Sequence, residues 1–293
     1  KKKLSKYMQE AIVKGNKHPV FQIFDFINII NLDAALVILF WTELICNDLG
    51  ISPNQIPKLV FFFCTWLGYS ADRFLEIFGR VQDSITSKRH LIFRNNKKVF
   101  ILVWFSILVF SIYLSVKCFS SLQIFYCLGL LVFVILNQVQ SLYQIPCVEL
   151  MFPKNIRTSL ILSLTCCYLP FFLIKEFSSE LIFLLIILGV LFWINCSKIK
   201  SWENSAKYRQ DKQDNVIENY KLQKLAKVIT AILVASFIIS FSMEFFFAEI
   251  GFVLTILILA YLDRSKLEPN LKRVLLDQVY WMIPSLILLL RWL

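Results

Sequence analysis

The sequence predicts an all-α, polytopic membrane protein that forms a single transmembrane domain over residues 1–293. Apolar residues make up 58% of the chain and the mean hydropathy is +0.66, whereas a soluble domain is roughly 45–50% apolar. The apolar runs are also continuous, while strands of a membrane barrel alternate apolar and polar residues. Because lipid offers no hydrogen bonds to the backbone, continuous apolar runs in a membrane are expected to be helices.

Nine apolar runs are expected to cross the membrane. A helix rises 1.5 Å per residue, so about 20 residues span about 30 Å of hydrocarbon. The fifth and sixth runs are short, and we expect their helices to extend into the flanking sequence. The predicted spans are 27–46, 56–75, 99–116, 122–142, 160–174, 181–194, 226–242, 246–262 and 276–293.

The distribution of Lys and Arg predicts the orientation of these spans. With nine spans, the amino-terminal segment and every second connection hold all but four of the 31 cationic residues. The positive-inside rule then places the amino terminus in the cytoplasm. The two largest cytoplasmic connections are expected at about 76–98 and 195–225. No organellar transit-peptide pattern is seen, and we expect an integral protein of a bacterial inner membrane. The four exceptions are Lys58, Lys117, Lys175 and Arg291.

The net charge of +11 does not require a nucleic-acid partner. Basic cytoplasmic loops set topology and attract anionic headgroups, so membrane lipid is the expected partner and nucleic acid is not. The eight cysteines lack paired metal-ligand spacing such as C-x-x-C and are predicted to be reduced thiols in apolar surroundings.

Two carboxylates close the second predicted span. Asp72 and Glu76 are four residues apart, which places them about 40° apart on one helix face. Since like charges one turn apart repel, a metal ion or an arginine is expected beside them. The alternative is a helix-end ladder in which Glu76 pairs with Arg80. Glu203 and Lys207 present the same two alternatives, a ligand-binding site or an exposed ion pair.

These features together resemble the UbiA superfamily of intramembrane prenyltransferases, which carry N-D-x-x-D-x-x-x-D after span two and D-x-x-x-D after span six. Asp72 and Glu76 match the end of the first motif, but Gly68 and Tyr69 stand where the family has Asn and Asp. The second motif is similar to the N-C-x-x-I-x-x-W-E pattern of a divergent branch, with Lys207 where an Asp is expected. The matching residues there are Asn195, Cys196, Ile199, Trp202 and Glu203.

Shorter matches extend the resemblance over nearly the whole chain, because they follow the same order. They are Asn31-Leu32-Asp33-Ala34, Arg89-His90, Pro153-Lys154, Asp277 and Pro284.

The resemblance implies transfer of a prenyl group from a prenyl diphosphate to a lipophilic acceptor. Magnesium ions on carboxylates, together with Lys or Arg, stabilise the leaving diphosphate in such a reaction. The implied Mg²⁺ ligands and catalytic residues are Asp72, Glu76 and Glu203. The implied diphosphate-binding residues are Arg80, Arg157 and Lys207.

Two further polar residues are candidates for substrate binding. Asp33 lies inside the first span, where an ionisable group lines a chamber or pairs with a neighbouring helix. Asn137, at the cytoplasmic end of span four, binds a polar headgroup or makes interhelical hydrogen bonds.

Whether the chain is an enzyme stays open at the level of sequence. The alternative is a non-catalytic UbiA-like subunit that acts as a scaffold or lipid-binding partner of other membrane subunits. The departures at Gly68, Tyr69 and Lys207 favour that alternative. A transporter with interrupted helices is disfavoured by the seven glycines in the chain.

Overall fold

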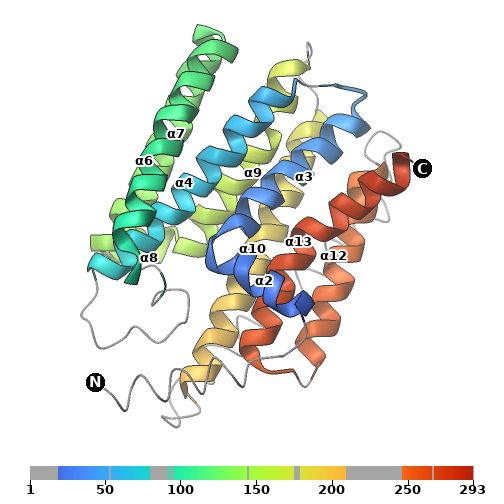
Figure 1. Cartoon of the computed structure of the whole chain (residues 1–293). Coiled ribbons are helices and arrows are strands. Elements are labelled where there is room, and N and C mark those ends of the chain that lie inside the picture. The colour runs from blue at the N-terminus through green and yellow to red at the C-terminus, as the bar shows by residue number, and fades with distance from the viewer. Residues whose placement is uncertain are drawn as a thin grey trace.

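The computed structural model describes residues 19–52, 54–79, 92, 95–143, 145–174, 179–208, 246–265 and 267–292. All regular elements in these ranges are helices, which confirms the all-α class (Figure 1). The helices are α2 (Pro19–Ile29), α3 (Leu32–Asp48), α4 (Gln55–Gly79), α6 (Lys97–Cys118), α7 (Ser121–Tyr143), α8 (Pro146–Met151), α9 (Lys154–Leu173), α10 (Ser179–Tyr208), α12 (Phe246–Arg264) and α13 (Pro269–Trp292).

Six of the described helices are long and apolar enough to cross a membrane, namely α6, α7, α9, α10, α12 and α13. The pair α2 and α3 adds a seventh crossing if its two pieces are one bent span. Helix α4 coincides with the predicted second span, but Lys58, Asp72, Arg73 and Glu76 lower its hydropathy. The predicted span 226–242 lies outside the described residues.

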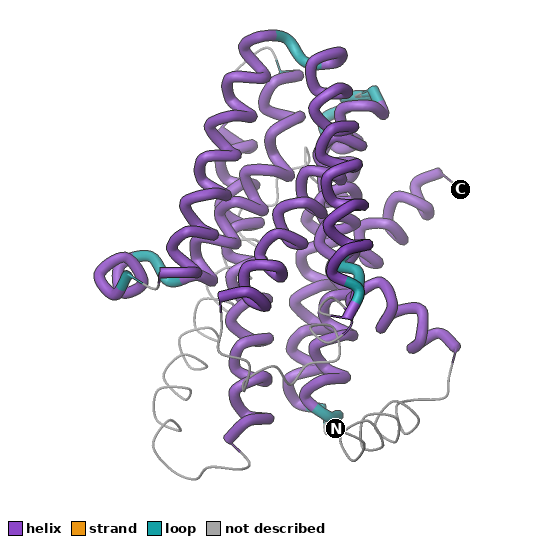
Figure 2. Tube along the Cα trace, turned by 60° about the vertical axis from the view of Figure 1, so that its left-hand side comes forward, coloured by secondary structure: helices purple, strands orange, loops and turns teal. Residues whose placement is uncertain are grey.

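The helices form an elongated bundle, in which α3, α4, α6, α7, α9, α10, α12 and α13 run along the long direction (Figures 1 and 2). Helices α6 and α7 lie at one side of the bundle and α12 and α13 at the other, with α3, α9 and α10 between them. Most of α6 and α7 is exposed, as expected for helices that face lipid. Polar contacts tie them to the bundle: Trp104 Nε1 donates to the Leu67 carbonyl (3.0 Å), and Gln138 Nε2 donates to the Gly68 carbonyl (3.1 Å).

Aromatic residues form the core where α3, α10, α12 and α13 meet. The fully buried Trp41 stacks on Phe252, with ring centroids 4.8 Å apart. Gly251 permits this contact, because a Cβ atom there would lie 3.1 Å from the Trp41 ring. Trp41 Nε1 donates to the Tyr280 carbonyl (2.9 Å), and the Tyr280 hydroxyl donates to the Leu191 carbonyl (2.8 Å). The indole and phenol thus satisfy their polar atoms inside the core.

The two ends of the bundle differ in charge among the described residues. We name the end where α4 and α10 finish and α9 begins the cationic end. The opposite end carries Lys58, Lys117 and Arg291. The cations at the cationic end are Arg73, Lys97, Lys98, Lys154, Arg157, Lys198, Lys200, Arg264, Lys272 and Arg273.

The first predicted span differs from the expectation of one continuous helix. Helices α2 and α3 are bent by 92° at a break, where Asn31 has left-handed backbone angles (φ 58°, ψ 28°). Asparagine is one of the few residues that adopt this conformation readily. The Ile30 carbonyl at the break accepts a hydrogen bond from Trp66 Nε1 (2.7 Å). A neighbouring helix therefore satisfies backbone that the break would otherwise leave without a partner.

The sixth span extends into the flanking sequence as expected, and α10 then continues to Tyr208, through residues predicted to belong to a connection. The fifth span extends as expected, since α9 begins at Lys154.

At the opposite end, Asp48 joins three helices. Its carboxylate accepts a hydrogen bond from the Ala248 backbone N–H (2.7 Å) near the start of α12 and pairs with Arg291 of α13 (3.3 Å). Its side chain is 2% exposed. We expect Asp48→Ala to lower the free energy of unfolding by about 1–3 kcal/mol, since a buried N–H loses its acceptor.

Thermal unfolding of the purified protein, followed by tryptophan fluorescence, measures this loss. Asp48→Asn keeps an acceptor oxygen but no charge, so its unfolding temperature should lie between those of the wild type and Asp48→Ala. Lys117→Ala, at the same end, serves as the control. Equal unfolding temperatures for Asp48→Ala and this control would contradict the assigned role.

The left-handed conformation at Asn31 predicts that a glycine variant is more stable than a valine variant. Asn31→Gly should be tolerated, because glycine adopts positive φ freely and the Asn31 Nδ2 has no hydrogen-bond partner among the described residues. Asn31→Val should cost about 1–2 kcal/mol of stability, since a β-branched residue is strained there. The same unfolding assay tests this order, and a valine variant as stable as the glycine variant would refute it.

Candidate functional site

Acidic side chains from distant parts of the chain meet inside the bundle. The Asn28 side-chain nitrogen donates to Asp33 Oδ2 (2.8 Å) and to Asp277 Oδ2 (2.8 Å). Asn28 is buried on α2, while Asp33 opens α3 and Asp277 lies on α13. One amide therefore holds two carboxylates together where the broken first helix meets the last helix.

Tyr69 links this pair of carboxylates to α4. Its partly buried side chain lies within electrostatic range of Asp33, Asp277 and Asp72. The position contributes a phenol, where the sequence resemblance leads one to expect an Asp.

Lys154 supplies the positive charge beside Asp72. Its ammonium lies 3.1 Å from Asp72 Oδ1 and 3.0 Å from Oδ2. The Lys154 backbone N–H donates to Glu149 Oε1 (3.1 Å). Lys154 and Asp277 both lie within electrostatic range of Cys196 of α10. We name these two pairs, Asp33 with Asp277 and Asp72 with Lys154, the polar cluster.

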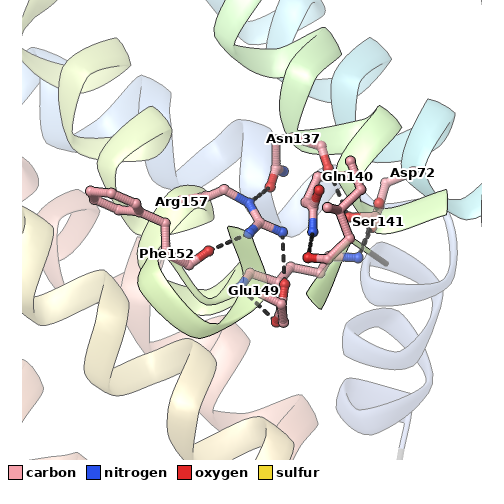
Figure 3. A network of polar contacts seen from close by, with 9 residues as sticks. Asp72, Asn137, Gln140, Ser141, Glu149, Phe152 and Arg157 are labelled. Atoms are coloured by element: carbon pink, nitrogen blue, oxygen red, sulfur yellow. Dashed lines mark hydrogen bonds and ion pairs between the residues drawn. The ribbon is translucent and has the colours of Figure 1, made fainter. Parts of the chain in front are cut away.

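A second network holds the connector between α7 and α9, residues 145–153, which contains α8 (Figure 3). Arg157 Nε donates to Asn137 Oδ1 (3.0 Å), and Arg157 Nη2 donates to Glu149 Oε2 (3.1 Å). Arg157 Nη1 donates to the Phe152 carbonyl. Since Glu149 also binds the Lys154 N–H, this network fixes the start of α9 and with it the ammonium that faces Asp72.

The structure groups the described site residues into three pairs at the cationic end. Asp33 joins Asp277 through Asn28, Asp72 pairs with Lys154, and Asn137 contacts Arg157. Arg80 lies outside the described residues, and the side chains of Glu76, Glu203 and Lys207 do as well, although their backbones lie in α4 and α10.

Sequence reasoning named neither Lys154 nor Asp277 as a site residue. Both occur in the short matches to the UbiA family, and that resemblance is the signal that pointed to them. Their partners lie 82 and 249 residues away along the chain, so no local spacing reveals the contacts.

The implied magnesium ion does not fit Asp72 as the structure places it. Mg²⁺ binds oxygen ligands at 2.0–2.1 Å, and an ammonium 3.0 Å from the same carboxylate repels it. Within the described ranges, no group of three or more His, Cys, Asp or Glu residues is arranged to hold a metal ion.

A cavity of about 500 Å³ lies between α7, α9 and α10. Its wall is formed mainly by aromatic and aliphatic side chains, including Tyr126, Phe133, Leu164, Phe171 and Leu185. These residues lie away from the ion pairs of the cationic end, so the cavity is separate from the polar cluster.

Comparisons of the chain with family models, curated proteins and solved structures found no match. The fold and the site therefore define the chain by physical class. It is an all-α protein whose apolar helices are compatible with an integral membrane protein. Asp33, Asp72, Asp277 and Lys154 lie in contacts between its helices.

The connector network predicts coupled effects at Glu149 and Arg157. Glu149→Gln and Arg157→Gln should each speed hydrogen exchange in residues 145–153, because each removes a charged partner from the connector. The double variant should add little to Arg157→Gln alone, since the two side chains act on each other. Fully additive effects would show that the two residues act independently.

Proposed function

We propose that the chain is a UbiA-like intramembrane prenyltransferase that binds a prenyl diphosphate at its cationic end. It transfers the prenyl group to an electron-rich lipophilic acceptor. The observation that carries this proposal is the presence of two sets of paired ionisable side chains in an apolar helical bundle: Asn28 joins Asp33 to Asp277, and Lys154 pairs with Asp72. Ionisable groups are costly within a membrane and in general mark a functional site.

The proposal includes nine spans with a cytoplasmic amino terminus. Helix α10 ends at the cationic end, whereas α12 begins at the opposite end beside Asp48. The concentration of described cations at one end supports a cytoplasmic assignment for that end.

The reaction needs charge compensation at the diphosphate. The bond between the allylic carbon and the diphosphate oxygen breaks, and its electron pair leaves with the diphosphate. The acceptor donates an electron pair to the allylic carbon and loses a proton to a carboxylate or to water. Lys154 is suited to neutralise the leaving diphosphate, and the carboxylates of Asp33 and Asp277 are suited to stabilise the allylic cation.

A non-catalytic subunit is the second candidate, and the Asp72–Lys154 ion pair favours it. Two oxygens within 3.1 Å of one ammonium form a closed salt bridge that stabilises the bundle without any ligand. On this alternative the chain retains the UbiA-like helical shell and associates with lipid or with other membrane subunits.

Binding and turnover of farnesyl diphosphate test the proposal. The full chain in lipid nanodiscs should bind this probe saturably, and inorganic pyrophosphate should compete with it. The double variant Asp33→Asn with Asp277→Asn should bind but release at least tenfold less pyrophosphate when membrane lipid extract supplies the acceptor. This loss is expected because the carboxylates no longer stabilise the cation.

Two results would count against the transferase. Saturable binding without pyrophosphate release in the wild type would support the non-catalytic subunit. A lack of saturable binding, both with magnesium and with a chelator, would refute the proposed site.

A further inference from the structure

We propose that Lys154 takes the place that the family resemblance assigns to a magnesium ion. On this inference, the chain binds the diphosphate through an ammonium group and needs no divalent cation for binding. The inference rests on the proposed function and specifies how the same site recognises its anionic substrate.

The first argument is the geometry at Asp72. Both carboxylate oxygens, which a metal ion would use, lie within 3.1 Å of Lys154 Nζ. A divalent cation bound there would face a positive charge at close range, so Lys154 and magnesium are alternatives at this carboxylate. In the family motif a metal ion compensates the negative charge of the diphosphate. In this chain the Lys154 ammonium would do so.

The second argument is accessibility. The side chain of Lys154 is 32% exposed and that of Asp72 is 21% exposed. At the opposite end, Lys58 pairs with Glu43 while its side chain is only 2% exposed. An anion can therefore approach the Lys154 ammonium, whereas the Lys58 ammonium is enclosed by protein.

The third argument is the charge of the two acidic motifs. Tyr69 stands where the first motif has an Asp, and Lys207 stands where the second is expected to have one. Each motif has thus lost a metal ligand, and the second has gained a cation. Fewer carboxylates and more cations are expected of a site that binds diphosphate directly.

The fourth argument is that the lysine is held in place. Its backbone N–H binds Glu149 (3.1 Å), which Arg157 fixes in turn. The adjacent Asn155 donates to Ser197 of α10 (3.5 Å). A positioned ammonium loses less conformational freedom when it binds an anion.

The experiment measures farnesyl diphosphate binding by the full chain in nanodiscs, with EDTA or with magnesium chloride. The wild type should bind with the same Kd within about twofold in both conditions. Lys154→Gln should weaken binding at least tenfold in EDTA, whereas Lys154→Arg, which keeps the charge, should lose less. Asp72→Asn should bind as well as the wild type or more tightly, since it removes a negative charge beside the ammonium.

Lys198→Gln is the matched control. Lys198 pairs with Asp263 at 2.8 Å, also at the cationic end, but its side chain is only 7% exposed, so this variant makes the same change of charge at an ammonium that protein encloses. It should bind within about twofold of the wild type. An equal loss in the two glutamine variants would overturn the assignment of Lys154.

The affinity of Asp72→Asn for farnesyl diphosphate distinguishes binding through Lys154 from binding through magnesium. Binding that requires magnesium and disappears in Asp72→Asn would overturn the inference and leave the proposed function standing. Absence of binding in every condition would overturn both. If Lys154→Gln elutes as an aggregate in size-exclusion chromatography, the comparison of EDTA with magnesium on the wild type decides the question.

Discussion

The contact on which the cluster depends is the bridge that Asn28 makes between Asp33 and Asp277. It joins α2 and α3 to α13, so the first and last described helices meet at one amide. Without this donor, two carboxylates would face each other at close range inside the bundle, where charge repulsion is weakly screened. The break at Asn31 serves this contact, since it places α2 at 92° to α3 and brings Asn28 beside both acids.

A neighbouring helix supplies a hydrogen bond to the backbone at that break. A continuous helix would satisfy its own backbone, whereas the broken one relies on Trp66 to donate to the Ile30 carbonyl. Trp66 lies on α4, the helix that also carries Tyr69 and Asp72. The aromatic residue that supports the break thus belongs to the same helix as the site, and the position of α4 is tied to the position of the acidic pair.

The sequence predicted the all-α class and the apolar helices that the structure describes, because their apolar runs are local and continuous. It placed a candidate charged site at Asp72 and Glu76, since two carboxylates four residues apart are visible without a structure. It did not predict the broken first span, because the stability of a left-handed Asn31 depends on tertiary contacts. It expected a metal or an arginine beside Asp72, and the structure places a lysine of another helix there. A contact between residues so far apart in the chain leaves no periodic pattern in the sequence.

Burial distinguishes the ion pairs of this chain by their physical roles. At the opposite end, the side chains of Lys58 and Asp48 are each 2% exposed, and Asp48 also accepts a backbone hydrogen bond. Such pairs are strongly destabilising to break, because removal of one partner leaves a buried charge uncompensated. Asp72 and Lys154 are partly exposed, so water lowers both the strength of the pair and the cost of separating it. When the Asp72–Lys154 pair separates, the Lys154 ammonium can bind a competing anion. A low cost of separation therefore suits a site that must bind and release a diphosphate.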